Sequence, residues 1–335
     1  PTFGSVTGTS EKDVWAGGTY GTLIHFDGAR WSDAGSYWGG HLTQLYGTSA
    51  SDVWATGDHG VILHFDGAGW FRVASGTDQP LRGLWTRPGQ GEVPGDAWAV
   101  DRDGTLLRFD GTSWLELPRD SAEEVHISAV HASPRGEVWA VGRGGTIQRW
   151  NGKSLVSEVS GTTKRLLGVW SNGPDDVWAV GEQATILHLS GKKWVSVPAG
   201  IAATRPGREL EGGGTLTPQN DLLGVWSSGG TTWAVGGPEF PDEGFVLRST
   251  GGAFTPSLPA VKGRLLCIWG SSARDVWAAG NNGVLVHFDG TAWTSAPRQT
   301  TEALNSLWGS GPSDVWAAGN SGTLLHYDGK AWSIV

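Results

Sequence analysis

The sequence predicts an all-β fold, a single domain of eight four-stranded units that closes into a β-propeller. The first observation is a short phrase, DVWAGG where it first occurs, that returns eight times around Trp15, Trp54, Trp98, Trp139, Trp178, Trp233, Trp277 and Trp316. Consecutive copies are 39, 44, 41, 39, 55, 44 and 39 residues apart, and a period near 40 residues indicates one supersecondary unit built repeatedly. The second observation is that glycine supplies 54 of the 335 residues. The glycines fall between short apolar runs, as tight turns between strands require.

The last unit shows the four predicted strands in order. They are the short runs 304–309, 314–319, 323–327 and 331–335, separated by turn residues. Asp328-Gly329, between the last two runs, is a strong hairpin signal because both central positions of such a turn favour positive φ. Runs of this length with tight turns predict antiparallel neighbours, and no segment has the 3.6-residue period of an amphipathic helix.

The same order of elements fits eight units, with approximate boundaries at 1–36, 37–75, 76–122, 123–160, 161–200, 201–259, 260–298 and 299–335. The hairpin dipeptide recurs as Asp27-Gly28, Asp66-Gly67, Asp110-Gly111, Asn151-Gly152, Ser190-Gly191, Thr250-Gly251 and Asp289-Gly290. The first unit begins with its own first strand, and the last unit ends with its own fourth strand. We therefore expect the ring to close by packing of the first unit on the eighth, without a strand shared between the termini.

Written as a consensus, the repeat is DVWAVG-x-x-G-x-ILH-[FY]-DG-x-x-W. This pattern resembles the tryptophan-rich propeller repeat of exported and lipoprotein-type bacterial proteins, and more loosely the photosystem II assembly-factor type of propeller and other BNR-like repeats. The resemblance covers nearly the whole chain. It implies a propeller fold and an extracytoplasmic location (secreted, periplasmic or lipoprotein-anchored), and it implies no single activity. The sialidase Asp-box, S-x-D-x-G-x-x-W, is not matched, because the units have D-G-x-x-W.

Composition excludes several classes of partner. The net charge is −9 and charged residues make up 17% of the chain, without a basic stripe, so binding to nucleic acid or to an anionic membrane is not expected. The single cysteine, Cys267, excludes an internal disulfide framework, and no apolar run is long enough for membrane insertion. The chain begins at Pro1 and contains no methionine, which favours a processed or trimmed product that has lost an export signal.

Cationic or imidazole side chains occupy one repeat position in the predicted third strands: His25, His64, Arg108, Arg149, His188, Arg248, His287 and His326. A ring of metal or anion ligands is one interpretation. The other is structural, because a buried cation or imidazole needs a partner. An acid opens the second strand in seven units, at Asp13, Asp52, Asp96, Glu137, Asp176, Asp275 and Asp314, with Thr231 in its place in the sixth. We favour the structural interpretation, since first strands, not third strands, line the axis of a propeller.

No catalytic constellation stands out, and the sequence predicts neither an enzyme nor a bound cofactor. Nucleophile-elbow, H-E-x-x-H, phosphate-loop and EF-hand motifs are missing, and Asp101-Arg102-Asp103-Gly104 has only the start of a calcium loop. Some propellers hydrolyse lactones or phosphoesters with a metal ion held by acidic and amide side chains from several blades. That alternative rests on four turn residues, Asp58, Asp101, Asn281 and Asn320.

Departures from the repeat point to the binding face. In a four-stranded propeller, the connections from each fourth strand to the next unit share a face with the turns between second and third strands. Most insertions of this chain fall there, at residues 33–42, 76–83, 119–126, 199–221 and 236–243, whereas 87–95 enlarge the opposite face. We therefore expect a ligand or partner to bind at the insertion-rich face.

The candidate binding residues on the insertion-rich face are Tyr20, Tyr37, Trp38, His41, His59, Arg102, Arg143, Arg205, Arg208 and Phe240. Trp38 lies outside every consensus position, and surplus aromatics in a glycine-flexed loop suit stacking on a sugar or on an apolar patch of a partner. A competing interpretation has Trp38 plugging the channel mouth or packing on the neighbouring blade. The irregular sixth unit, where Trp233 stands between the two longest insertions, is the other expected place for function.

The predicted function is therefore recognition by a non-enzymatic scaffold that binds a protein partner on the insertion-rich face. Exposed-looking positions vary between units while structural ones repeat, which favours one irregular binding face. The first alternative is lectin-like, multivalent binding of a glycan through equivalent pockets in every blade. The second alternative is a metal-dependent propeller hydrolase.

Overall fold

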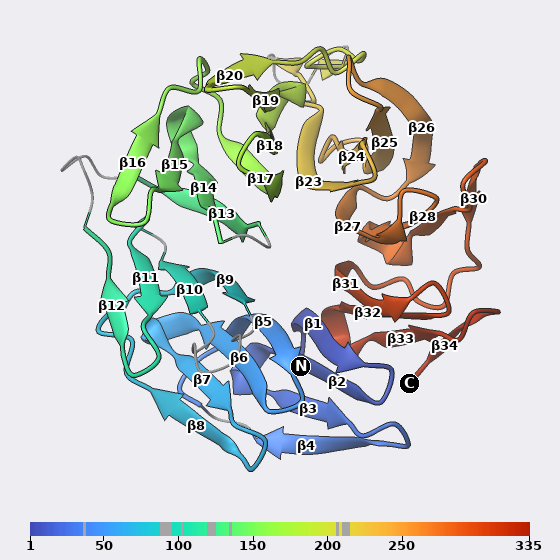
Figure 1. Cartoon of the computed structure of the whole chain (residues 1–335). Coiled ribbons are helices and arrows are strands. Elements are labelled where there is room, and N and C mark those ends of the chain that lie inside the picture. Colours follow the sequence, from blue (N-terminus) through green and yellow to red (C-terminus); the bar gives the residue numbers. More distant parts are fainter. Residues whose placement is uncertain are drawn as a thin grey trace.

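The computed structural model of the chain describes residues 1–35, 38–87, 96–101, 103–118, 125–133, 136–205, 208–209 and 215–335, with the backbone alone at 208–209, 215–216 and 259. Eight four-stranded antiparallel sheets form a ring, with the first strand of each blade innermost and the fourth outermost (Figure 1). Each sheet contains four strands that are consecutive in the sequence. The predicted eight-bladed β-propeller is thus confirmed.

The strands of blades 1 to 4 are β1 (Phe3–Ser10), β2 (Asp13–Gly18), β3 (Leu23–Phe26) and β4 (Trp31–Gly35); β5 (Leu42–Ser49), β6 (Asp52–Gly57), β7 (Ile62–Phe65) and β8 (Trp70–Val73); β9 (Leu81–Arg87), β10 (Asp96–Asp101), β11 (Leu106–Phe109) and β12 (Trp114–Glu116); β13 (Ile127–Ala132), β14 (Val138–Gly142), β15 (Ile147–Trp150) and β16 (Leu155–Glu158). Those of blades 5 to 8 are β17 (Leu166–Gly173), β18 (Asp176–Gly181), β19 (Ile186–Ser190) and β20 (Lys193–Ser196); β23 (Asp221–Ser228), β24 (Thr231–Gly237), β25 (Glu243–Ser249) and β26 (Thr255–Lys262); β27 (Leu265–Ser272), β28 (Asp275–Gly280), β29 (Leu285–Phe288) and β30 (Trp293–Ser295); β31 (Leu304–Gly311), β32 (Asp314–Gly319), β33 (Leu324–Tyr327) and β34 (Trp332–Ile334).

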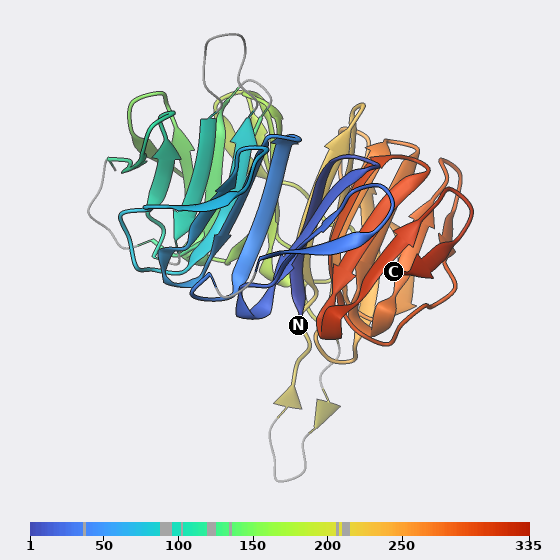
Figure 2. The ribbon, with the colours of Figure 1, turned by 90° about the horizontal axis from the view of Figure 1, so that it is seen from below.

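Short 3₁₀ turns join the second and third strands in six blades: η1 (Thr19–Gly21), η2 (Asp58–Gly60), η3 (Arg143–Gly145), η4 (Glu182–Ala184), η5 (Asn281–Gly283) and η6 (Asn320–Gly322). A two-stranded hairpin, β21 (Arg208–Glu209) with β22 (Thr215–Leu216), interrupts the connection between blades 5 and 6. Figure 2 shows this hairpin projecting away from the ring, on the side where the N-terminus lies. The sequence predicted an insertion at this point but not its strands.

Ring closure joins blade 8 directly to blade 1. β1 packs beside β31 and β32, just as β5 packs beside β1 within the ring. The Val6 N–H donates to Ser306 Oγ at 3.3 Å, and Asn305 Nδ2 donates to the Phe3 carbonyl at 3.0 Å. The termini share no strand, so the predicted mode of closure is confirmed.

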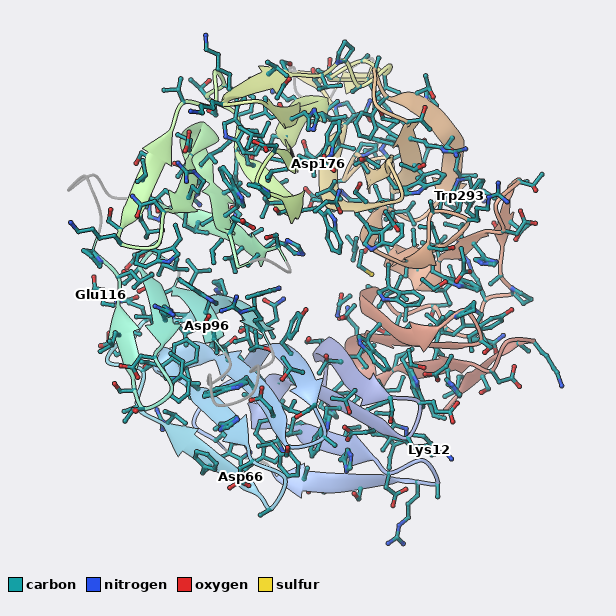
Figure 3. All side chains as sticks on the ribbon, viewed as in Figure 1. Lys12, Asp66, Asp96, Glu116, Asp176 and Trp293 are labelled. Carbon is teal, nitrogen blue, oxygen red and sulfur yellow. The ribbon has the colours of Figure 1, made fainter. Side chains whose placement is uncertain are left out.

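The repeated tryptophans hold adjacent blades together. Seven of the eight second-strand indoles meet the fourth-strand aromatic of the next blade edge-on, at 5.1–5.6 Å and 77–86°. The pairs are Trp15–Trp70, Trp54–Trp114, Trp139–Trp194, Trp178–Phe254, Trp233–Trp293, Trp277–Trp332 and Trp316–Trp31. Edge-to-face contact is a favoured arrangement for aromatic pairs. Blade 4 carries Leu155 in its fourth strand, and Trp98 contacts Trp150 of the third strand instead. Figure 3 shows side chains filling the spaces between blades.

The third-strand histidines pair with acids of their own blades, as the structural interpretation predicted. The imidazole Nε2 lies 2.6–3.1 Å from the carboxylate in His25–Asp13, His64–Asp52, His188–Asp176, His287–Asp275 and His326–Asp314. Each ring also stacks on the second-strand indole, at 3.9 Å and 18° between His25 and Trp15. Arg108 pairs with Asp96 at 2.7 Å in the same way.

Two blades depart from the predicted pairing. Arg149 pairs with Glu158 of the fourth strand at 2.9 Å and not with Glu137, whose carboxylate accepts a hydrogen bond from Ser133. Blade 6 has no acid at this position, and the Arg248 guanidinium lies over the faces of Trp233 and Phe288, at 4.9 Å and 5.4 Å from their centroids. Cation–π contact therefore takes the place of the ion pair there.

The paired carboxylates predict a loss of stability in acid. Burial raises the pKa of Asp314, but hydrogen bonds from His326, Ser310 and Trp316 outweigh it and hold the pKa below the ordinary value of 3.8. Asp13 and Asp52 behave in the same way. Since the folded-state pKa lies below the unfolded value, the stabilisation is complete above about pH 4 and is lost as the pH falls below it.

Urea unfolding measured from pH 6 to pH 3 checks this expectation. The free energy of unfolding is expected to fall below pH 4, and to fall less steeply in Asp314→Asn, whose amide does not titrate in this range. Identical pH profiles for the two proteins would show that Asp314 contributes nothing to the acid sensitivity.

Candidate functional site

The face predicted to carry function is formed by the turns between second and third strands and by the connections between blades, and is called the insertion face below. Hydrogen bonds join these two kinds of segment. The Asp58 N–H donates to the His41 carbonyl and the Arg143 N–H to the His126 carbonyl, both at 2.9 Å. The predicted geometry, with both kinds of loop on one face, therefore holds.

Tyr20 and His41, two predicted binding residues, lie together on the insertion face. The Tyr20 N–H donates to His41 Nδ1 at 2.9 Å, and the two rings meet edge-on at 5.6 Å. The Tyr20 side chain is 71% exposed. The pair thus presents a phenol ring whose backbone is held by the neighbouring blade.

Backbone strain marks Tyr20 and His59. Both lie in the left-handed region, with φ of 61° and 54°, at the middle of their 3₁₀ turns. Equivalent positions in other blades hold Gly144, Gln183, Asn282 and Ser321. Gln183 and Ser321 have the same positive φ, so the conformation belongs to the repeated turn, at a cost on the order of 1 kcal/mol for a bulky residue. Both side chains are exposed, which keeps them as candidates.

Trp38 packs against the interface between blades 1 and 2. It contacts a buried cluster that includes Leu23, Leu42 and Val61, and its indole Nε1 is buried without a partner among the described residues. Its ring lies so close to Gly35 that an added Cβ would be 2.9 Å from it. This is the arrangement of the competing interpretation, packing on the neighbouring blade. Tyr37 lies outside the described residues.

The candidates of the sixth blade lie elsewhere on the ring. The Arg205 guanidinium pairs with Glu243 and donates from Nε to Asn220 Oδ1 at 3.2 Å. It therefore stabilises the long connection between blades 5 and 6. Phe240 is 49% exposed, directly before the cis peptide bond to Pro241. Arg208 begins β21, and its side chain is outside the described part of the chain.

A basic cleft gathers residues that sequence reasoning mostly missed. It has a volume of about 270 Å³ and is lined by Arg82, His126, Ile127, Ser128, Arg143 and Arg165, and is called the arginine cleft below. Blades 3, 4 and 5 each contribute to it. Arg165 Nε donates to Ser128 Oγ at 2.9 Å, which fixes one guanidinium at its wall.

The arginine cleft carries positive charge that the described residues do not neutralise. Arg82 and Arg143 are exposed, and within the described ranges neither forms an ion pair, whereas Arg87, Arg108 and Arg205 each do. A guanidinium offers a rigid fork of donors that matches a carboxylate. The cleft can therefore bind an anionic group between three guanidinium side chains.

Of the cleft residues, the sequence singled out Arg143 alone. A further candidate, Arg102, lies outside the described residues. The sequence did offer one signal for the cleft, a position that recurs in the repeat directly before the first apolar residue of the first strand. His41, His126, Arg165 and Arg264 occupy it, and the connections between blades place it on the insertion face.

Three of the four turn residues considered for a metal site, Asp101, Asn281 and Asn320, form side-chain hydrogen bonds within the protein. Asn281 Nδ2 donates to Asp242 Oδ1 at 2.9 Å, and Asp101 Oδ1 accepts the Thr105 N–H at 2.7 Å. Within the described ranges, no group of three or more His, Cys, Asp or Glu side chains could hold a metal ion. No helix in that part of the chain is long and apolar enough to span a membrane.

Comparisons with known proteins identify the fold. No protein-family model matches the chain, and no curated protein matches it. YCF48 bound to D1 peptide is 17% identical, with a TM-score of 0.59 over 97% of this chain and 93% of that one. Sqt1 of Saccharomyces cerevisiae and the computationally designed Ika8 protein are each 13% identical, with TM-scores of 0.73 over 98% of this chain and 96% of theirs. Identities this low show the propeller fold alone, so the tryptophan-rich repeat family stays a prediction.

Proposed function

We propose that this chain is a non-enzymatic recognition module that binds an acidic segment of a protein partner on the insertion face, with the arginine cleft as its anchor. One observation carries the proposal: three arginines from successive blades line one cleft in a chain whose net charge is −9. An acidic protein repels acidic ligands over most of its surface. A local basic cleft is therefore a place where acidic ligands can still bind.

The form of the cleft favours carboxylates of a protein. Its volume of about 270 Å³ suits a side chain or a chain terminus better than a whole small-molecule ligand, since pockets for such ligands usually hold about 300–1,000 Å³. Charge-assisted hydrogen bonds from guanidinium to carboxylate are worth about 1.5–3 kcal/mol each. The complex of YCF48 with D1 peptide supports the proposal to the extent that a propeller of similar fold binds a peptide.

The exposed turn residues favour one irregular face over equivalent pockets. The middle of the 3₁₀ turns holds Tyr20, His59, Gly144, Gln183, Asn282 and Ser321. A multivalent lectin needs the same ligand-contacting residue in every blade, and these differ in size, charge and aromaticity. The residues that do repeat, the histidines and their acids, bond to each other within the blades.

Binding of fluorescein-labelled hexaglutamate, followed by fluorescence anisotropy, tests the proposal. The wild-type protein is expected to bind saturably, and more weakly as salt is raised. The double variant Arg82→Ala/Arg143→Ala is expected to bind at least tenfold more weakly, because it removes two charge-assisted contacts. Both side chains are exposed, so the variant is expected to fold normally.

The matched control is Arg30→Ala, which removes an arginine that is 83% exposed in the turn between β3 and β4, on the opposite face. It is expected to change the affinity less than twofold. The double variant removes two charges and the control one, so a loss of binding free energy in Arg30→Ala at least half as large as in the double variant would reduce the effect to net charge. Wild-type affinity in the double variant would overturn the role of the cleft. Saturable binding of neutral glycans would favour the lectin-like alternative.

A further inference from the structure

The central channel contains a second cavity, lined by the first strands of blades 2 to 5. Its volume is about 570 Å³, and its wall includes Tyr46, Trp85, His131 and Trp170; it is called the aromatic cavity below. Its polar residues, Thr48, Arg87 and Asn172, lie near the ends of the first strands, before the turns to the second strands. It therefore opens toward the face opposite the insertion face, and nothing in the proposed function uses it.

The rest of the ring shows how this space is normally filled. In blades 6, 7 and 8, the six-membered ring of the first-strand indole closely approaches a glycine of the next blade. A Cβ added to Gly270, Gly309 or Gly8 would come within 2.5–2.7 Å of Trp226, Trp269 or Trp308. Only glycine allows this close approach of a ring to the backbone.

Blades 3 to 6 depart from that arrangement. Thr86, Ala132, Ser171 and Ser227 follow the first-strand ring position where the other four blades have glycine, and His131 stands where five blades have tryptophan. The larger residues keep the rings of the preceding blades farther from the backbone, and the smaller imidazole leaves the place of an indole incompletely filled. The aromatic cavity is the space that results.

Four aromatic rings line the wall of the aromatic cavity. His131 and Trp170 lie 4.3 Å apart at 31°, and Tyr46 and Trp85 lie 6.4 Å apart. His131 Nδ1 accepts the Ser171 N–H at 3.1 Å, which requires this nitrogen to be unprotonated. Burial lowers the pKa of His131 to about 4, so the imidazole is neutral at physiological pH.

Most polar groups of the wall are already bonded. Arg87 pairs with Asp96. Asn172 accepts the Trp170 indole N–H at 2.9 Å and donates to Asp176 at 2.7 Å. Thr86 is the exception: it is 2% exposed, and its Oγ1 has no partner among the described residues. That oxygen has almost no accessible surface, so a ligand in the cavity contacts the rings and not Thr86 Oγ1.

We infer that the aromatic cavity is a binding site for a neutral planar aromatic group, such as an indole or a phenol. The four rings of its wall supply the stacking surfaces. The volume falls within the range of pockets for small organic ligands. A charged group is disfavoured because the wall offers no unpaired charge among the described residues.

Titration with 5-fluoroindole, observed by ¹⁹F NMR, tests the inference. The wild-type protein is expected to bind it saturably. His131→Trp places the ring found at this position in five other blades into the cavity and is expected to weaken binding at least tenfold. Thr86→Val changes an oxygen that is shielded from the cavity, and is expected to bind 5-fluoroindole like the wild type.

Two controls separate this site from other effects. His131→Ala leaves the cavity open and is expected to keep binding, provided that thermal melting shows it folded. Arg143→Ala alters the arginine cleft alone and is expected to bind 5-fluoroindole like the wild type. The test of the aromatic cavity therefore does not depend on whether the proposed function of the arginine cleft is correct. Absence of saturable binding by the wild type, or wild-type affinity in folded His131→Trp, would overturn the inference.

Discussion

Replacing Trp316 with alanine is expected to lower the free energy of unfolding by about 3–5 kcal/mol, the usual cost of truncating a buried large aromatic. Trp316 is fully buried. It contacts Phe26 at 5.2 Å and Trp31 at 5.5 Å, both in blade 1. The substitution therefore opens a cavity at the one interface where the chain ends meet.

Urea unfolding followed by circular dichroism measures this loss, and Trp54→Ala is the matched control. Trp54 makes the equivalent contacts to Phe109 and Trp114 at the interface between the consecutive blades 2 and 3. Because the closing interface repeats the internal one, the two variants are expected to lose similar stability. A loss below 1 kcal/mol for Trp316→Ala alone would show that the ring is held closed by other contacts.

Replacing Asp314 with alanine is expected to cost about 3 kcal/mol, close to the effect of removing one partner of a buried pair. The Asp314 side chain is 9% exposed. Its carboxylate accepts hydrogen bonds from Ser310, from the Trp316 indole at 2.9 Å and from His326 at 2.8 Å. The change leaves these three donor groups without their acceptor in a poorly solvated place. A substitution between apolar residues nearby would instead alter the packing alone.

Blade 6 provides the control for Asp314→Ala. Thr231 holds the position of the acid there, and Arg248 relies on Trp233 and Phe288. Thr231→Ala is therefore expected to cost about 1 kcal/mol or less, measured by the same unfolding experiment. Equal losses in the two variants would contradict the view that the carboxylate joins the network.

Residues that are close in the repeat could be paired from the sequence. His25 and Asp13 are twelve residues apart in one blade, and adjacent antiparallel strands place them together in five blades. The prediction for Arg149 was wrong because its blade offers two acids. Glu158 on the fourth strand pairs with it, while Glu137 bonds to Ser133. The position of Arg149 in the repeat alone does not decide which of the two acids it pairs with.

Sites built from several blades were harder to predict. Arg82, Arg143 and Arg165 are far apart in the sequence and come together because three neighbouring blades present their ends at one cleft. Trp38 shows the reverse case, since an aromatic that looked available in the sequence packs on the blade interface. Whether a loop side chain turns inward depends on the space that its neighbours leave.

The sequence by itself determined the eight blades, their strand order and the closure of the ring, because a period near 40 residues with hairpin signals admits few other folds. It also determined most of the ion pairs inside the blades. Only the tertiary structure decided where free charge and open space remain. The arginine cleft and the aromatic cavity both lie among blades 2 to 5, and each depends on the curvature of the ring and on side chains that fail to fill it.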